Sequence, residues 1–192
     1  MRVLLLTPVP VYLSTPLIAA GDYYIVSMNE PDKWPEDIDF VVSFGYRHIL
    51  SREVIEHLRG RLINIHMSLL PWNRGCDPNF WSWFDGTPKG VSIHAIDEGV
   101  DTGDILAQKE ITDLNTLETL RSSYSKLTHV ASDLFATEWP RLRRMDWDPI
   151  HPSIGGTYHR AGETDQWFNK LTHGWDTPVW EVEILGGSSR GN

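Results

Sequence analysis

Short runs of consecutive apolar residues recur along the chain, and segments with helical spacing separate them. Such runs are typical of strands covered on both faces of a parallel sheet, and they occur at 2–6, 23–27, 38–45 and 61–66. Residues 51–58 begin with a serine, carry apolar residues at helical spacing and precede a glycine, so they predict a helix. Strand, helix and strand in this order predict a right-handed parallel crossover.

Turn-forming residues divide the middle of the chain into further elements. The expected elements are a loop at 67–79, a helix at 79–86, strands at 90–96 and 105–111 around a loop at 97–104, and one long helix at 116–145. Beyond residue 146 the pattern becomes irregular, with a short helix expected at 163–173, a strand at 179–185 and a disordered tail at 186–192. The fold class is therefore α/β with a parallel sheet.

Composition narrows the classes of protein to which the chain could belong. Its 192 residues are 41% hydrophobic and 22% charged, which suits one globular domain. The formal net charge of −9 argues against a nucleic-acid partner, because it repels phosphate backbones. The single cysteine, Cys76, excludes an intramolecular disulfide framework. The N-terminal apolar run is too short to cross a membrane and contains prolines, so no membrane partner and a cytoplasmic location are predicted.

Candidate chemistry lies at the end of the strand 61–66. Asn64 and His66 are two positions apart, so both point to the same side of the strand. Ligands bind beyond the carboxyl ends of parallel strands, and Asp97, Asp101 and Asp104 follow the next strand along the chain. A carboxamide stabilises an oxyanion, a histidine moves a proton, and a carboxylate orients the imidazole.

These residues by themselves leave two other interpretations open. A histidine at a strand end is more often structural than catalytic. His66, His94 and Asp101 would also suit zinc, but no HxxxH or CxxC spacing supports a metal site, so none is predicted.

Two linked motifs resemble the folate-dependent formyltransferases. Residues 62–83 read LINIHMSLLPWNRGCDPNFWSW, and residues 90–111 read GVSIHAIDEGVDTGDILAQKEI. The family pattern is N-x-H-x-S-L-L-P-x-x-R-G followed by D-x-G-x-D-T-G-D-I-L. This family includes methionyl-tRNA, glycinamide ribonucleotide and sugar N-formyltransferases, and the chain is most similar to the small sugar enzymes.

The resemblance implies a trimmed Rossmann-like sheet flanked by helices, with a formyltransferase catalytic domain at 1–145 and a C-terminal appendage at 146–185 packed on it. It implies Asn64, His66 and Asp101 as the catalytic residues and N10-formyltetrahydrofolate as formyl donor, with no metal. The residues implied for folate are Tyr46, Ile49, Leu50, Ile96, Asp97, Glu98, Gly99 and Val100.

The acceptor is inferred from where the chain departs from other members of the family. The phosphate loop of a glycinamide ribonucleotide enzyme is absent after 2–6, and too few residues follow the long helix for the C-terminal barrel of a tRNA enzyme. The resemblance therefore implies that the acceptor is a small-molecule amine, in the first place the amine of a nucleotide-linked amino sugar. It implies Tyr158, His159 and Arg160 as the residues that contact this acceptor.

Other functions, and another role for Tyr158, His159 and Arg160, stay open. In that other role these three residues hold the C-terminal segment against the domain. The other functions are formylation of a small amine such as an N-hydroxylated amino acid, and a folate-binding or hydrolytic relative. Tryptophans near the C-terminus are compatible with a homodimer.

Overall fold

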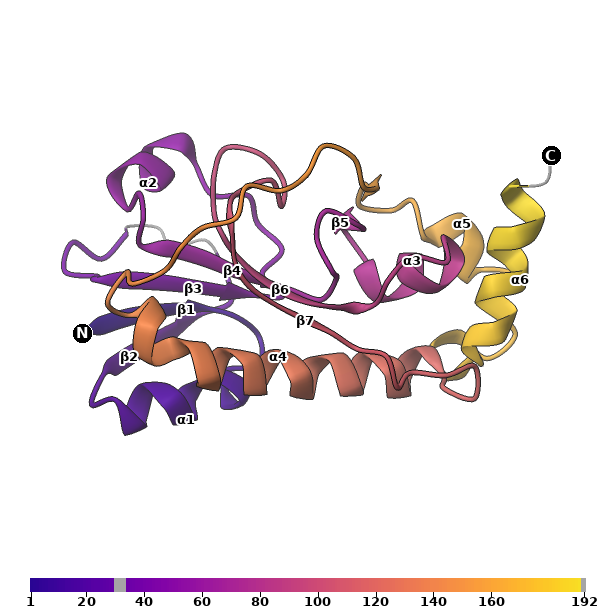
Figure 1. Ribbon diagram of the computed structural model, residues 1–192, viewed down its shortest axis with the longest axis horizontal. Helices are drawn as coiled ribbons and strands as arrows, with labels where there is room; N and C mark the ends of the chain where they lie inside the picture. The colour runs from indigo at the N-terminus through magenta and orange to yellow at the C-terminus, as the bar shows by residue number, and fades with distance from the viewer. Residues whose placement is uncertain (30–33, 191–192) are drawn as a thin grey trace.

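A six-stranded sheet crosses the molecule in the computed structural model, which describes residues 1–29 and 34–190 (Figure 1). The strand order is β2-β1-β3-β4-β6-β7, and β5 and β8 form a separate pair. The strands are β1 (Arg2–Leu6), β2 (Tyr23–Ser27), β3 (Phe40–Phe44), β4 (Leu62–His66), β5 (Arg74–Gly75), β6 (Gly90–Ala95), β7 (Ile105–Glu110) and β8 (Tyr158–His159).

The sheet is mixed, which corrects the prediction of a parallel sheet. Strands β2, β1, β3 and β4 are parallel, whereas β6 pairs antiparallel with both β4 and β7. The loop 96–104 returns the chain directly from β6 to β7, and a direct return pairs two strands antiparallel. Sequence alone gave β6 and β7 their positions but not their directions.

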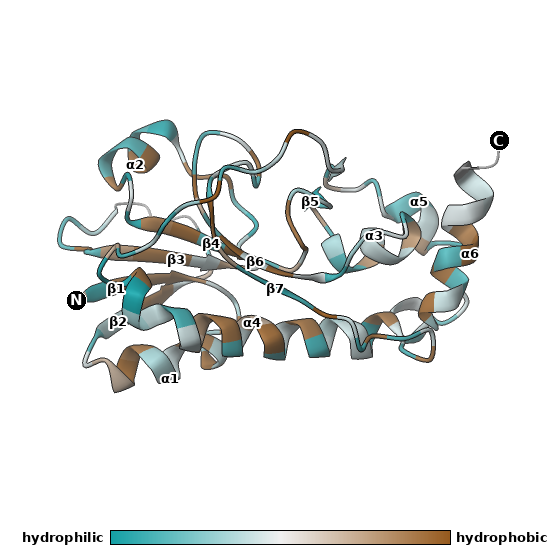
Figure 2. Cartoon of the chain, in the orientation of Figure 1, coloured by the Kyte–Doolittle hydropathy of each residue, from teal (hydrophilic) through white to brown (hydrophobic). Residues whose placement is uncertain are grey.

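Helices cover both faces of the sheet. Figure 1 shows α1 (Val11–Ala19) and α4 (Leu120–Leu142) on one face and α2 (Arg52–His57) on the other. Alternate residues of each strand face one side, so Leu5 and Val42 pack toward α4 while Leu4 and Val41 pack toward α2. The helices are α1 (Val11–Ala19), α2 (Arg52–His57), α3 (Pro78–Phe84), α4 (Leu120–Leu142), α5 (Asp165–Phe168), the 3-10 turn η1 (Gly174–Asp176) and α6 (Val179–Arg190). Figure 2 shows hydrophobic residues along β3 and β4 and a mixture of both kinds along α4.

Helix α1 forms in a proline-containing stretch where the sequence predicted no helix. Pro10 occupies its N-cap, where a missing N–H costs nothing. Pro16 lies inside the helix and offers no N–H to the carbonyl of Tyr12. The hydroxyl of Ser132 on α4 donates to that carbonyl at 2.7 Å, so a tertiary contact replaces the lost helical hydrogen bond.

The C-terminal end of the chain is helical, which corrects two predictions. Val179–Arg190 forms α6, where a strand was expected at 179–185 and a disordered tail from 186; residues 191 and 192 lie outside the described part of the chain. Val179 and Val182 are fully buried and pack with residues of α3. They are three positions apart, which is the spacing of one face of a helix. A Cβ on Gly186 would stand 1.8 Å from the Phe84 carbonyl oxygen, so this glycine permits close approach of α6 to α3.

The segment from 151 to 159 crosses back over the loop that follows β4. β8 pairs with β5 in parallel, Arg74 opposite Tyr158 and Gly75 opposite His159. A Cβ on Gly75 would stand 2.1 Å from the His159 carbonyl oxygen, and a Cβ on Gly156 would stand 2.0 Å from that of Pro71. The C-terminal segment is therefore packed tightly against the post-β4 loop.

Candidate active site

Asn64 and His66 lie at the carboxyl end of β4 and share one face of the sheet. Both lie an even number of positions from Leu62, so they point to the same side of the strand as Leu62, which packs toward α2. Ile65 points to the other side and is buried in the cluster beneath α4. The shared face predicted for Asn64 and His66 is confirmed. His66 is 7% exposed.

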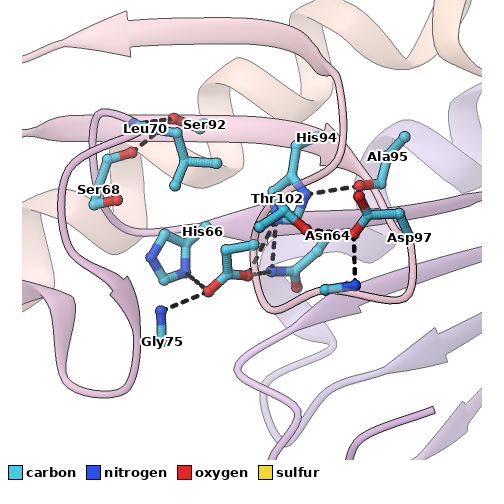
Figure 3. Close-up of polar contacts among 12 residues, drawn as sticks. Asn64, His66, Ser68, Leu70, Gly75, Ser92, His94, Ala95, Asp97 and Thr102 are labelled. Atoms are coloured by element: carbon cyan, nitrogen blue, oxygen red, sulfur yellow. Dashed lines mark hydrogen bonds and ion pairs between the residues drawn. The ribbon is translucent and has the colours of Figure 1, made fainter. Parts of the chain in front are cut away.

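Asp101 brings these groups together from the loop between β6 and β7. Its Oδ1 accepts from Asn64 Nδ2 at 3.2 Å, and its Oδ2 lies 3.6 Å from His66 Nδ1. The backbone N–H of Gly75 donates to the same Oδ2 at 2.8 Å. Figure 3 shows Asn64, His66 and Gly75 gathered at this point. The structure therefore places Asn64, His66 and Asp101 within one contact network.

His94 is a fourth member of this network. It lies directly opposite Asn64 on the antiparallel strand β6, so both side chains occupy the same face. Its Nδ1 donates to the Ala95 carbonyl at 2.8 Å, and its Nε2 lies 3.2 Å from Asn64 Nδ2 and 3.3 Å from Asp101 Oδ1. The sequence offered His94 only as a zinc ligand, because its register with Asn64 depends on the direction of β6.

The electrostatics of the site keep Asp101 ionised. Burial opposes the charged carboxylate, but His66, His94 and the Gly75 N–H together outweigh burial and hold the pKa of Asp101 well below its usual range. The Asp101 backbone has a φ of 52°, in the left-handed region that non-glycine residues rarely adopt. Asp101 is thus a permanent anion at neutral pH, aimed at two imidazoles.

A second set of contacts holds the loop after β4. Ser92 Oγ donates to the Ser68 carbonyl at 2.7 Å and accepts from the Leu70 N–H at 3.0 Å. Gln108 Nε2 donates to the Leu70 carbonyl at 2.9 Å. These bonds tie the loop to β6 and β7 (Figure 3 shows those of Ser92), so the motif residues have a fixed path.

Asn73 carries the other contact of His66, and the sequence did not single it out. The Asn73 carbonyl accepts from His66 Nε2 at 2.8 Å. Asn73 is fully buried with a φ of 55°. Both ring nitrogens of His66 therefore face hydrogen-bond acceptors, a carboxylate on one side and a carbonyl on the other.

The residues implied for folate lie in two segments, 46–50 and 96–100. Tyr46 and Ile96 are partly buried against the α2 cluster, and Leu50 is buried. Ile49 and Val100 are exposed apolar side chains.

The loop that bears Asp101 is held from within. Asp97 accepts from the Gly99 N–H at 3.0 Å and from the Thr102 hydroxyl at 2.7 Å, while Glu98 lies 3.4 Å from Arg52. Figure 3 shows the contacts of Asp97. These bonds define the backbone path of 97–102 just before and after Asp101.

A cavity of ≈ 400 Å³ opens beside Asp101. One wall comes from the loops after β4 and β6, and the other from the C-terminal segment. The lining residues are Pro71, Arg74, Asp97, Asp101, Thr102, His151, Pro152, Ser153, Ile154 and Gly155. The C-terminal segment thus contributes directly to the space next to the catalytic candidates.

The three candidate substrate residues have different surroundings. The His159 ring stacks on Trp81 with centroids 3.8 Å apart and planes at 4°. Its Nε2 lies 2.8 Å from Asp85, so its ring belongs to the packing of the C-terminal segment. Tyr158 is 44% exposed, and Arg160 is exposed.

Neither a metal-binding cluster nor a membrane-spanning helix is found among the described residues. Across 1–29 and 34–190, no group of three or more His, Cys, Asp or Glu side chains is arranged to hold a metal ion. Over the same ranges, no helix is both long enough and apolar enough to pass through a membrane.

Comparison with known protein families tests the resemblance to formyltransferases that the two motifs suggested. The formyl transferase family model matches residues 33–137, more than half of the chain. The chain belongs to the formyl transferase family. The resemblance and the α/β fold class predicted from the sequence are confirmed. The match includes Asn64, His66 and Asp101.

Curated relatives in this family align with part of the chain. Methionyl-tRNA formyltransferase of Thermodesulfovibrio yellowstonii is 36% identical over 107 residues, which is 55% of this chain and 34% of the relative. Phosphoribosylglycinamide formyltransferase of Bacillus subtilis is 36% identical over 96 residues, 48% of this chain and 49% of the relative. The chain therefore spans about a third to a half of the length of these relatives.

A solved structure matches almost the whole chain. The formyltransferase PseJ from Anoxybacillus kamchatkensis, in complex with UDP-4,6-dideoxy-4-formamido-L-AltNAc and tetrahydrofolate, superposes with a TM-score of 0.91. It is 38% identical, and the alignment covers 97% of this chain and 100% of PseJ. The likeness includes the C-terminal part of the chain, beyond the family model.

Proposed function

We propose that this chain transfers a formyl group from N10-formyltetrahydrofolate to the primary amine of a nucleotide-linked amino sugar. The observation that carries the proposal is the full-length similarity to PseJ, whose structure holds tetrahydrofolate and a formylated UDP-sugar. The cluster of Asn64, His66 and Asp101 supplies the groups that formyl transfer requires.

Asn64 is placed to stabilise the developing oxyanion. Attack by a neutral amine on the formyl carbon puts negative charge on the formyl oxygen, which amide N–H groups stabilise. The Asn64 nitrogen has two hydrogens, and its neighbours are Asp101 Oδ1 and His94 Nε2. Transfer therefore redirects one of these hydrogens to the formyl oxygen, while the other contact keeps the carboxamide oriented.

His66 is the second group at the reacting carbonyl. Its Nδ1 faces Asp101 and its Nε2 faces the Asn73 carbonyl, and these two contacts orient the imidazole. In the proposed reaction His66 either stabilises the oxyanion or carries the ammonium proton away. The new C–N bond forms to the acceptor amine as the bond to N10 breaks, and the amine proton finally resides on N10 of tetrahydrofolate.

The folate is proposed to lie against the residues around 46–50 and 96–100. The donor supplies the formyl group. Partly buried Tyr46 and Ile96, buried Leu50 and exposed Ile49 and Val100 offer an apolar lining for a flat ring. The backbone of Asp97, Glu98 and Gly99, fixed by the Asp97 carboxylate, offers polar groups for ring nitrogens.

The acceptor is proposed to contact Tyr158 and Arg160, which are exposed beside the catalytic loop. A guanidinium suits the phosphates of a nucleotide sugar. His159 is proposed to anchor this segment through Trp81 and Asp85. A homodimer remains a proposal; Trp175 and Trp180 are 44% and 45% exposed.

A screen of acceptors tests the proposed function. Purified protein with N10-formyltetrahydrofolate is incubated with nucleotide amino sugars or with N-hydroxylated amino acids, and formylated product is measured by mass spectrometry. We expect product with a nucleotide amino sugar and no formate release in its absence. Product with hydroxylated amino acids alone would reassign the acceptor, and formate release without amine would indicate a hydrolase.

A further inference from the structure

Asn73 and Thr157 are joined by two hydrogen bonds next to the site. The Asn73 N–H donates to Thr157 Oγ1 at 2.8 Å, and Thr157 Oγ1 donates to Asn73 Oδ1 at 2.9 Å. The Arg74 N–H donates to the Thr157 carbonyl at 3.0 Å. Thr157 thus binds the main chain and side chain of one residue and the main chain of the next.

Asn73 is otherwise fully engaged. Its side-chain Nδ2 donates to Thr87 Oγ1 at 2.7 Å, so its amide has no freedom to turn. The residue is 0% exposed and has a left-handed backbone. A non-glycine residue keeps this conformation only where surrounding contacts determine it, and the hydrogen bonds with Thr157 and Thr87 are those contacts.

The carbonyl of Asn73 is the group that meets His66. It accepts from Nε2 at 2.8 Å, on the ring edge away from Asp101. Asp101 in turn accepts from the N–H of Gly75, which pairs with β8 two residues after Thr157. The same crossing of the C-terminal segment therefore determines the position of both partners of the His66 imidazole.

We propose that Thr157, acting through Asn73, is a positioning residue for His66, so that the C-terminal segment completes the catalytic site. This inference rests on the proposed formyl transfer. Thr157 touches neither His66 nor Asp101 in the described contacts, so its effect is on geometry. A displacement of reacting groups by about 1 Å costs of the order of 100-fold in rate.

Two substitutions separate the hydrogen bonds of Thr157 from its bulk. Thr157→Val keeps the shape and removes the hydroxyl, whereas Thr157→Ser keeps the hydroxyl. Thr137→Val, at an exposed position of α4 where the hydroxyl bonds only its own helix, is the matched control. We expect Thr157→Val to lower kcat at least about 10-fold with little change in KM for the acceptor, and to alter the pH profile of kcat. Thr157→Ser should restore most of the rate.

A spectroscopic measurement keeps this proposal separate from the proposed function. The ring signals of His66 are recorded by NMR, after assignment with His66→Gln, in folded wild type and variants. We expect Thr157→Val to move these signals and Thr157→Ser and Thr137→Val to leave them near wild type. If wild type forms no product with any acceptor, formyl transfer fails while this comparison still decides the positioning role.

Clear outcomes would overturn the positioning role. These are unchanged His66 signals with wild-type kcat in Thr157→Val, an equal loss in Thr157→Ser, or a change in KM alone. If circular dichroism reports Thr157→Val to be unfolded, Thr157→Ala takes its place with the same expectations.

Discussion

Asn64 and His94 stand opposite each other on antiparallel strands, with the carboxamide nitrogen 3.2 Å from the imidazole Nε2. The same Nε2 lies 3.3 Å from Asp101. His94 therefore lies within contact distance of two of the proposed catalytic groups. The His94 Nδ1 donates to the Ala95 carbonyl. The Nε2 atom therefore either accepts a hydrogen bond from Asn64 or donates one to Asp101.

The first prediction concerns these contacts of His94. His94→Gln should lower kcat for formyl transfer by about 10-fold, because misorientation of Asn64 weakens the oxyanion contact. Steady-state kinetics with a nucleotide amino sugar measure the effect. His57→Gln, at an exposed position of α2, is the control and should match wild type. Wild-type turnover in His94→Gln would contradict the role.

The second prediction concerns the catalytic groups themselves. Asn64→Ala and His66→Ala should each lower formyl transfer at least about 100-fold, as the loss of an oxyanion donor does. Circular dichroism verifies that both variants are folded. Near-normal turnover in both variants would remove the mechanism proposed for this site.

The third prediction concerns acid stability. The pKa of Asp101 is depressed in the folded protein, so its stabilising contribution is fully present above the unfolded value near 3.8 and is lost as the pH falls toward the folded value. Between about pH 5 and about pH 2, wild type should lose of the order of 2 kcal/mol more unfolding free energy than Asp101→Asn. Urea unfolding at several pH values measures this difference.

A control at the surface makes this comparison specific. Asp133→Asn removes a carboxylate from an exposed position of α4 and should retain the wild-type slope of stability against pH. An Asp101→Asn slope as steep as that of wild type would contradict the electrostatic role of Asp101.

The fourth prediction concerns the crossing of the C-terminal segment. Gly75 and Gly60 both have positive φ, 90° and 78°, but only at Gly75 would a Cβ meet another backbone, 2.1 Å from the His159 carbonyl. Gly60→Ala should cost about 1–2 kcal/mol from the backbone conformation alone. Gly75→Ala should cost clearly more and expose the segment 151–159 to limited proteolysis. Equal losses in both variants would show that the crossing does not constrain β5.

Much of the fold could be predicted from the sequence because local patterns determine local structure. Continuous apolar runs located four strands of the main sheet, and the segments at 90–96 and 105–111 were also predicted as strands. Helical spacing located α2 and α4, and a helix ending at Gly86 was predicted where α3 lies. Helix α1 was not predicted, since its prolines suggested a break and the compensating bond from Ser132 comes from a distant helix. The alternating residues of α6 suggested a strand, whereas burial against α3 makes Val179 and Val182 one helical face.

The sequence by itself indicated the family of this protein and singled out Asn64, His66 and Asp101 as candidate catalytic residues, because these lie within two motifs that can be read from the sequence. Only the tertiary structure decided that β6 runs antiparallel to β4, which places His94 opposite Asn64. It also decided that Thr157 meets Asn73, 84 residues away in the chain. Such contacts depend on strand direction and on where a returning segment packs, and neither property is encoded in the periodicity of any single stretch.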